Sequence, residues 1–196
     1  NLALHNEDQI FYATAPGIES LLATMPIDYK LDGPSGRMVG PYADSLVAHL
    51  SGLIGSAEKE LLIVAPYWSV QGVSDIARRI NKRSAPGLKV TVLVEADSDT
   101  SNRAGAADFC SLMTNKLLGQ VTVKQPRKLK SGFYPTLHAK VIVVDRKRAY
   151  VGSANFSESG LKSSIEMGVG LTGTHALQVA EWFDSLMGHF EPIEFD

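Results

Sequence analysis

Residues 137–145 read Leu-His-Ala-Lys-Val-Ile-Val-Val-Asp, and this stretch decides the fold. Its apolar run from Val141 to Val144 is typical of a strand that is buried on both faces of a sheet. Successive side chains of a strand point to opposite faces, so His138 and Lys140 share one face and Asp145 has the opposite parity. The sequence therefore predicts a central strand that carries an imidazole beside an ammonium group, with Asp145 as a structural hydrogen-bonding residue.

Helical and strand patterns alternate around this stretch. Apolar positions at helical spacing predict helices at 18–25, 46–54, 73–80, 106–118 and 177–190, and short apolar or β-branched runs predict strands at 61–65, 89–95, 120–124, 149–152 and 166–171. Strands that alternate with helices of this length favour a mixed, largely parallel sheet covered on both faces. The expected fold class is thus α/β, an α/β/α sandwich.

The chain divides at one loose, turn-rich stretch, Asp32 to Gly36. We expect residues 1–36 to form a partly helical N-terminal extension and residues 37–196 to form the main domain. A chain of 196 residues is long enough to bury a core without a metal or disulfide.

Composition excludes several classes of protein. Nineteen basic and 21 acidic residues give a net charge of −2, which excludes a strongly basic nucleic-acid wrapper but not a local basic patch. The single cysteine, Cys110, excludes an internal disulfide and a multi-cysteine metal site and fits a reducing compartment, so we expect a cytoplasmic protein. No apolar run approaches the ~20 residues that span a bilayer, so membrane insertion is not expected.

A second polar cluster follows the central strand. The sequence Gly152-Ser153-Ala154-Asn155 places small residues at a strand end, where backbone N–H groups and side-chain donors can converge on an anion. Glu166 begins the next predicted strand, and a carboxylate near an imidazole fixes its tautomer. A nucleophile beside a fixed cation is the arrangement that phosphate chemistry needs.

These residues together resemble a known motif. The string His138-x-Lys140, four residues, Asp145, six residues, Gly152-Ser153-x-Asn155 is similar to the HKD motif of the phospholipase D superfamily. Glu166, 28 residues after His138, falls where that family places the acidic partner of its histidine. The order of strands and helices after Arg37 resembles the family as well.

The resemblance implies cleavage of a phosphodiester in two steps, without a metal or another cofactor. It makes His138 the nucleophile, and it assigns phosphate binding to Lys140, Ser153 and Asn155. Glu166 would orient the imidazole, and Asp145 and Gly152 would give structural support. The family chemistry needs two histidines, and this chain has one such string. Single-motif relatives form twofold dimers, so the resemblance implies a homodimer in which two copies of His138 share one site.

The residues favour nucleic acid over lipid as the partner; they do not distinguish DNA from RNA, and we take DNA as the expected form. Six cations flank the central strand and are candidates for a groove that binds a polyanion: Lys124, Arg127, Lys128, Lys130, Lys147 and Arg148. Tyr67 and Trp68 can stack on bases or cap the core, and Phe133 and Tyr134 can stack or contact a lipid.

Three functions remain open at this point. The first is a nuclease, and stand-alone relatives of this kind resemble components of bacterial phage-defence clusters with partner proteins. The second is a phospholipase, and the third is a catalytically silent nucleic-acid-binding module. The stretch Asp97-Ser98-Asp99, with Glu95 nearby, is interpreted as a solvated loop rather than a cation site, and no metal ligand is assigned.

Overall fold

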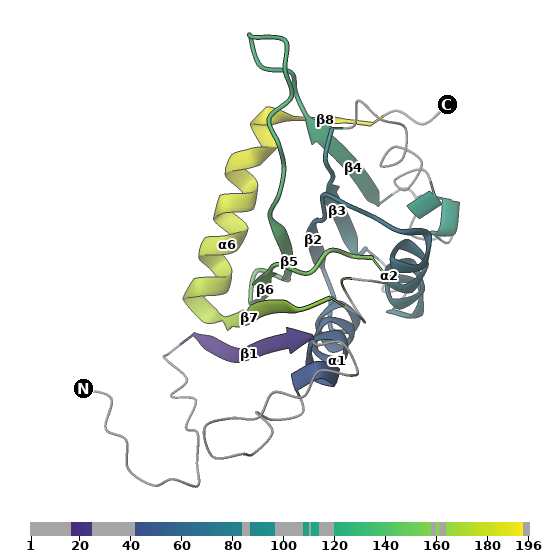
Figure 1. Cartoon of the computed structure of the whole chain (residues 1–196), viewed down its shortest axis with the longest axis vertical. Coiled ribbons are helices and arrows are strands. Elements are labelled where there is room, and N and C mark those ends of the chain that lie inside the picture. Colours follow the sequence, from purple (N-terminus) through teal and green to yellow (C-terminus); the bar gives the residue numbers. More distant parts are fainter. Residues whose placement is uncertain are drawn as a thin grey trace, which may run out of the picture.

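The computed structural model describes residues 17–24, 42–83, 87–96, 108–109, 111–113, 120–157, 160 and 164–193. Within them, one eight-stranded sheet has the order β1-β7-β6-β5-β2-β3-β4-β8 (Figure 1). The strands are β1 (Ile18–Thr24), β2 (Glu60–Val64), β3 (Lys89–Leu93), β4 (Val121–Pro126), β5 (Lys140–Val144), β6 (Arg148–Gly152), β7 (Glu166–Thr172) and β8 (Phe190–Pro192). The helices are α1 (Tyr42–Gly55), α2 (Val70–Arg83), α6 (Gly173–Leu186) and the short 3₁₀ helix η1 (Met187–His189).

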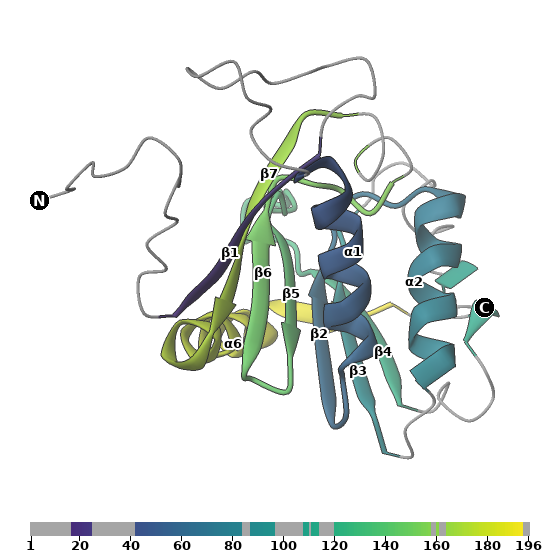
Figure 2. The ribbon, with the colours of Figure 1, turned by 90° about the horizontal axis from the view of Figure 1, so that it is seen from below.

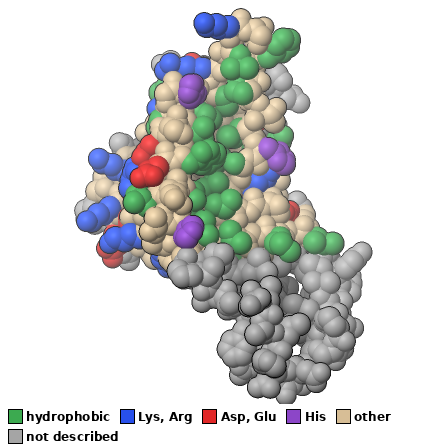
Figure 3. All heavy atoms as spheres, turned by 90° about the vertical axis from the view of Figure 1, so that its left-hand side faces the viewer, with side chains coloured by type: hydrophobic (Ala, Val, Ile, Leu, Met, Phe, Trp, Pro, Cys, Tyr) green, Lys and Arg blue, Asp and Glu red, His purple; other side chains and the backbone are tan. Residues whose placement is uncertain are grey.

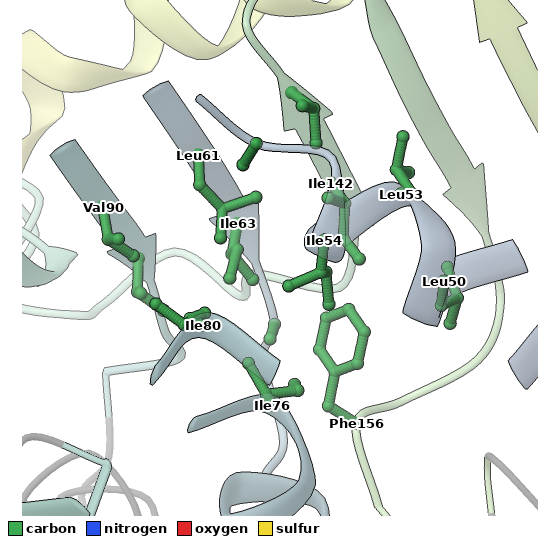
Figure 4. Close-up of a cluster of buried hydrophobic side chains, with 14 of the residues drawn as sticks. Leu50, Leu53, Ile54, Leu61, Ile63, Ile76, Ile80, Val90, Ile142 and Phe156 are labelled. Carbon is green, nitrogen blue, oxygen red and sulfur yellow. The ribbon is translucent and has the colours of Figure 1, made fainter. Parts of the chain in front are cut away.

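The sheet separates two hydrophobic cores. Helices α1 and α2 lie side by side against one face (Figure 2), and Leu53, Ile54 and Ile80 pack there against Ile63 and Ile142 of the sheet (Figure 4). Helix α6 packs against the other face through three buried residues, Ala176, Ala180 and Phe183. The predicted α/β class, with a mixed sheet and helices on both faces, is confirmed.

The predicted excess of parallel pairing is wrong. Only the pairs β2–β3 and β3–β4 are parallel, and the other five pairs are antiparallel. A parallel pair needs a long crossover, which α2 provides between β2 and β3. Strands β5 and β6 are joined instead by a turn of three residues, 145–147, which can connect only antiparallel strands.

The predicted helix at 18–25 is also wrong, because residues 18–24 form strand β1. This strand pairs antiparallel with β7, and its Leu22 is buried in the core beneath α1. A sheet edge offers a full ladder of backbone hydrogen bonds, and this long-range pairing overrides a local helical pattern. Part of the N-terminal segment therefore belongs to the sheet of the main body, while the division of the chain at residue 36 stays a prediction.

The C-terminal prediction needs a smaller correction. Helix α6 ends at Leu186, and Phe190, assigned to the helix from its spacing, begins β8, which pairs with β4. The helix expected at 106–118 lies largely outside the described residues.

Helix α6 covers only part of its face of the sheet. Beside it lies an open apolar groove of about 370 Å³, and Figure 3 shows a band of hydrophobic side chains along this side of the molecule. The groove is lined by Ala139, Val141, Val151, Leu171, His175, Gln178, Val179 and Trp182.

Strand β5 lies near the middle of the sheet, and all five of its residues are buried. Ile142 and Val144 face the core under α1 and α2, whereas Val141 and Val143 face the core under α6. The strand thus fills both cores, as its β-branched composition predicts. His138 precedes the strand and is exposed.

The turn after β5 holds two residues in the left-handed region. Asp145 has a φ of 51° and Arg146 a φ of 58°, which costs non-glycine residues about 1–2 kcal/mol each. Arg146 offsets this cost with ion pairs to Glu60 at 2.8 Å and Asp184 at 2.6 Å, which join the turn to β2 and α6. The turn is therefore anchored both to a strand of the sheet and to the helix that covers one face of it.

The carboxylate of Asp145 accepts three backbone hydrogen bonds. The N–H groups of Glu58, Lys59 and Glu60 donate to it at 3.0, 2.8 and 2.9 Å. Burial alone would raise the pKa of Asp145, but these three donors and the charge of Lys147 lower it below its usual 3.8. The ionised carboxylate therefore fixes the start of β2 against the end of β5.

Replacing this carboxylate should destabilise the fold. Asp145→Asn weakens three charge-assisted bonds, and we expect a loss of about 2 kcal/mol, which corresponds to a Tm lower by roughly 4–8 °C for a chain of this length. Because the pKa is lowered in the folded state, its contribution is full above 3.8 and is lost as the pH falls below that value. Thermal unfolding of both proteins between pH 2 and pH 7 measures this, and the variant should lose less stability in acid.

The matched control is Asp108→Asn, which removes an exposed carboxylate. Its Tm should stay within about 1 °C of the wild type, since substitutions at such surface positions change stability little. An Asp145→Asn variant as stable as this control would contradict the role given to the carboxylate.

Candidate active site

His138 lies on a loop whose backbone is held on both sides. The N–H of Leu137, which is buried, donates to the carboxylate of Glu95, just beyond the end of β3. The carbonyl oxygen of His138 accepts a hydrogen bond from Nζ of Lys140 at 2.7 Å. The imidazole therefore projects to solvent from a fixed backbone.

Lys140 is only 2% exposed and is the one buried charged residue in the described part of the chain. Burial lowers the pKa of Lys140 below 10.5, and the nearby carboxylate of Glu166 opposes this shift. A buried ammonium next to the loop of His138 supplies a fixed positive charge where the central strand β5 begins.

Ser153 and Glu166 meet at the adjoining strand ends. The Ser153 hydroxyl donates to the Glu166 carboxylate and accepts from the N–H of Met167 at 3.1 Å, while its backbone N–H donates to the Met167 carbonyl at 2.9 Å. In the described structure no hydrogen bond joins Glu166 to His138. Glu166 thus lies with Lys140 and Ser153, and its orientation of the imidazole stays a prediction.

Gly152 leaves room for the ring of Tyr150 beneath this cluster. A Cβ on Gly152 would lie 2.2 Å from the Tyr150 hydroxyl oxygen, and one on Gly168 would lie 2.4 Å from the ring carbon Cε2. Tyr150 is fully buried, and burial raises its pKa to about 12. The neutral ring therefore supports residues 152–154 from below, and neither glycine position tolerates a side chain.

Asn155 follows on the same loop with an unusual amide. Its Oδ1 is buried and finds no hydrogen-bond partner among the described residues. Buried polar atoms without partners are rare and need an explanation, and one explanation is a ligand that completes the site. Because an amide oxygen only accepts hydrogen bonds, it cannot pair with a phosphate oxygen, so the phosphate contact predicted for Asn155 would use its NH₂ group and stays a prediction.

The structure separates Tyr67 from Trp68. Tyr67 is 43% exposed, and its ring meets the ring of His138 edge-on, with centroids 6.4 Å apart. Trp68 packs instead against Phe109 and Phe156, with ring centroids 5.3 and 6.3 Å apart. Trp68 is partly buried and packs against the core, as the alternative of a core-capping role predicts, and its stacking on bases stays a prediction, while Tyr67 is exposed beside the imidazole.

The predicted basic residues also fall into two groups. Arg127, Lys128 and Lys130 are exposed on the connection from β4 to β5, which leads directly to His138. Lys147 and Arg148 lie at the opposite end of β5, since Arg148 pairs with Val144. Val144 is six residues from His138, which at about 3.3 Å per residue is roughly 20 Å. The prediction of one continuous groove is therefore wrong for these two residues.

Two residues of the site were missed in the sequence. The sequence places Glu95 near Asp97 and Asp99, in a stretch interpreted as a solvated loop, and these two aspartates lie outside the described residues. Glu95 itself directly follows a strand of the parallel part of the sheet. Sites in α/β sheets form at the carboxyl ends of such strands, so its position was the available signal. Tyr150 carried no signal, because its role depends on two glycines of neighbouring strands.

The chain is similar to several characterised proteins. Residues 50–187 match the family described as cardiolipin synthase, PLD-like domain. The DISARM protein DrmC of Bacillus paralicheniformis is 26% identical over 149 residues, which are 75% of this chain. The matched residues make up 59% of DrmC, so this chain spans about three fifths of the length of that relative.

Solved structures share the fold. NucT from Helicobacter pylori superimposes with a TM-score of 0.64 at 20% identity, over 89% of this chain and 100% of that one. Nuc from Salmonella typhimurium gives 0.62 at 20% identity, over 90% and 99%. Phosphatidylserine synthase from Haemophilus influenzae gives 0.58 at 18% identity, over 89% and 39%. No helix among the described residues has the length and apolar character to cross a membrane.

A glycine packed beneath the site and a glycine in an open position of helix α1 should respond in opposite ways to substitution by alanine. Gly152→Ala places a methyl group against Tyr150, and overpacking of this kind costs about 1–3 kcal/mol. Gly52→Ala adds a methyl in helix α1, where no other atom lies within 4 Å, and should stabilise the chain by about 1 kcal/mol. Chemical denaturation of the two variants measures both changes. An unchanged stability of Gly152→Ala would mean that Tyr150 does not press on this loop.

Proposed function

The chain belongs to the family of cardiolipin synthase-type, phospholipase D-like domains, and on this basis we propose that it is a metal-independent phosphodiesterase that cleaves nucleic acid. The observation that carries the proposal is the meeting of Lys140, Ser153 and Glu166 beside the loop of His138. A nucleophile, a fixed cation and hydrogen-bond donors at one sheet edge are the groups that phosphoryl transfer requires.

The reaction proceeds in two displacements. Nitrogen of the His138 imidazole attacks phosphorus, and the P–O bond to one ester oxygen breaks as the N–P bond forms. A second imidazolium protonates the departing oxygen and then, as the neutral base, takes a proton from water. The hydroxide oxygen attacks phosphorus, the N–P bond breaks, and His138 is free again. Lys140 and Asn155 stabilise the charge on the non-bridging phosphate oxygens.

The second imidazole comes from another copy of the chain. His138 is exposed, so a twofold axis beside it brings two copies to one phosphorus atom. The functional particle in this proposal is a homodimer with one shared site. A location in the cytoplasm remains a prediction.

Nucleic acid is favoured over lipid as the substrate, and DNA is the form that we propose to test. Tyr67 offers an exposed ring beside His138, and three exposed cations lie on the connection that leads to it. The similarity to a DISARM protein supports a role in bacterial phage defence together with partner proteins. A phospholipase is the second candidate, which the family description and the likeness to a phosphatidylserine synthase favour.

Cleavage in the presence of a chelator tests the proposal. The wild-type chain should cleave single-stranded DNA in excess EDTA, and His138→Ala should abolish cleavage while the fold and dimer persist, as circular dichroism and light scattering report. Release of phosphatidic acid from phospholipid without DNA cleavage would support the phospholipase instead. Binding of DNA without turnover of either substrate would identify a silent module.

Lys140 should contribute strongly to the rate. Loss of one preorganised donor to the phosphate removes ~3 kcal/mol of transition-state stabilisation, so Lys140→Ala should lower kcat by about 10²–10³-fold. Lys147→Ala removes an exposed cation at the far end of β5 and should leave kcat within about twofold. Steady-state cleavage of a labelled oligonucleotide measures both. Similar rates for the two variants would refute the role of Lys140.

A further inference from the structure

The connection between β4 and β5, residues 127–139, forms an ordered projection. It extends beyond the body of the molecule at the top of Figure 1. The N–H of Leu129 donates to the carbonyl of Phe133 and the N–H of Gly132 donates to that of Leu129, both at 2.8 Å. Gly132 has a φ of 85°, which glycine adopts without strain, so the turn is a stable hairpin. We call residues 127–134 the finger.

Two exposed apolar side chains flank the turn at the tip of the finger. Phe133 is 75% exposed, the highest fraction of any large hydrophobic side chain in the described residues, and Leu129 is 53% exposed. Single exposed apolar residues are common on surfaces, but two at the tip of a hydrogen-bonded hairpin form a contact point. Because the backbone of the hairpin is already fixed, little conformational entropy is lost when this tip binds a partner.

The finger is also strongly basic, and one of its cations, Lys130, lies in the turn itself. Residues 120–139 contain four Lys or Arg and no Asp or Glu, in a chain with a net charge of −2. Nζ of Lys128 lies 5.3 Å from the ring centroid of Tyr134, a cation–π contact that fixes one of these charges. Basic and hydrophobic side chains occur together at this end of the molecule in Figure 3. The finger is complementary to an anionic partner with apolar faces.

We infer that the finger binds single-stranded nucleic acid, with Phe133 stacked on an unpaired base and the cations on the flanking phosphates. The inference rests on the proposed function and extends it to the form of the substrate. Phe133 is five residues from His138, so at most about 17 Å of chain separates the stacked base from the reacting phosphate. Tyr67 beside His138 provides a second ring for the same strand.

A lipid surface fits the finger less well. A complete myristoyl chain gives only marginal, reversible membrane binding, and the two apolar side chains of the tip bury less surface than that chain. Stacking on a base needs only one exposed ring, and every base offers a face to it. Unpaired bases are accessible in single strands, whereas a duplex buries them in its stack.

Equilibrium binding tests the inference separately from catalysis. In a His138→Ala background, a fluorescent single-stranded oligonucleotide should bind about 10- to 100-fold more weakly to Phe133→Ala than to the parent, and Phe133→Trp should restore binding. The control Leu177→Ala removes an exposed apolar residue of α6 and should change the Kd less than twofold. A Kd unchanged in Phe133→Ala would overturn the inference.

Salt dependence distinguishes the roles of the ring and the cations. Lys130→Ala should reduce the slope of log K against log salt by about 0.7, the loss of one phosphate contact to a single strand. Phe133→Ala should weaken binding at every salt concentration without changing that slope. A changed slope in Phe133→Ala would contradict stacking.

Two further measurements separate the possible failures. If the wild type cleaves an oligonucleotide and Phe133→Ala cleaves it equally well, the finger has no such role and the proposed function stands. If the parent binds the oligonucleotide through Phe133 but the wild type never cleaves it, the inference stands and the nuclease does not. If Phe133→Ala abolishes sedimentation with phosphatidylglycerol vesicles and leaves oligonucleotide binding intact, the finger is a membrane contact and the inference is wrong.

Discussion

A buried ammonium group is the constraint on which the rest of the site depends. Lys140 is almost wholly removed from water, and such a charge is tolerated only where a hydrogen bond and an opposite charge accompany it. The carbonyl of His138 and the carboxylate of Glu166 provide these, one from the loop before β5 and the other from β7. Removing a partner of a buried charge costs about 3–5 kcal/mol, so the loop and two strands must keep their register.

The opposite end of β5 is fixed as well. There the carboxylate of Asp145 binds three consecutive N–H groups, and Arg146 joins β2 to α6. The strand between them fills both cores with β-branched side chains. A rigid element held at both ends places a reactive group more accurately than a loop can, and the histidine lies just beyond such an element.

Local patterns predicted what depends on neighbours in sequence and failed where distant segments meet. The central strand, the helices near 46–54 and 73–80 and the polar cluster after Gly152 follow from periodicity and residue type. The strand spans 140–144 rather than the predicted 137–145, so His138 lies on the loop before it. Alternation alone did not show that Trp68 packs inward while Tyr67 reaches His138, because both neighbours are aromatic. Residues 18–24 form a strand because they pair with β7, whose edge would otherwise be unpaired. Glu95 contacts Leu137 only because β3 and β5 lie on either side of β2. These outcomes depend on tertiary contacts between residues far apart in sequence, which no short stretch of sequence contains.

The pairing of distant strands also has a consequence for the order in which the chain folds. The donors to Asp145 lie 85–87 residues before it, and Ile18 pairs with Leu171. Closing such long loops costs entropy before any contact forms, so the ribosome must release most of the chain before the central pair can assemble. Strand β1 can pair only after β7 has been synthesised, and it then completes the sheet at its edge. Because most of these contacts join residues far apart in sequence, we expect the chain to fold more slowly than one built on local contacts.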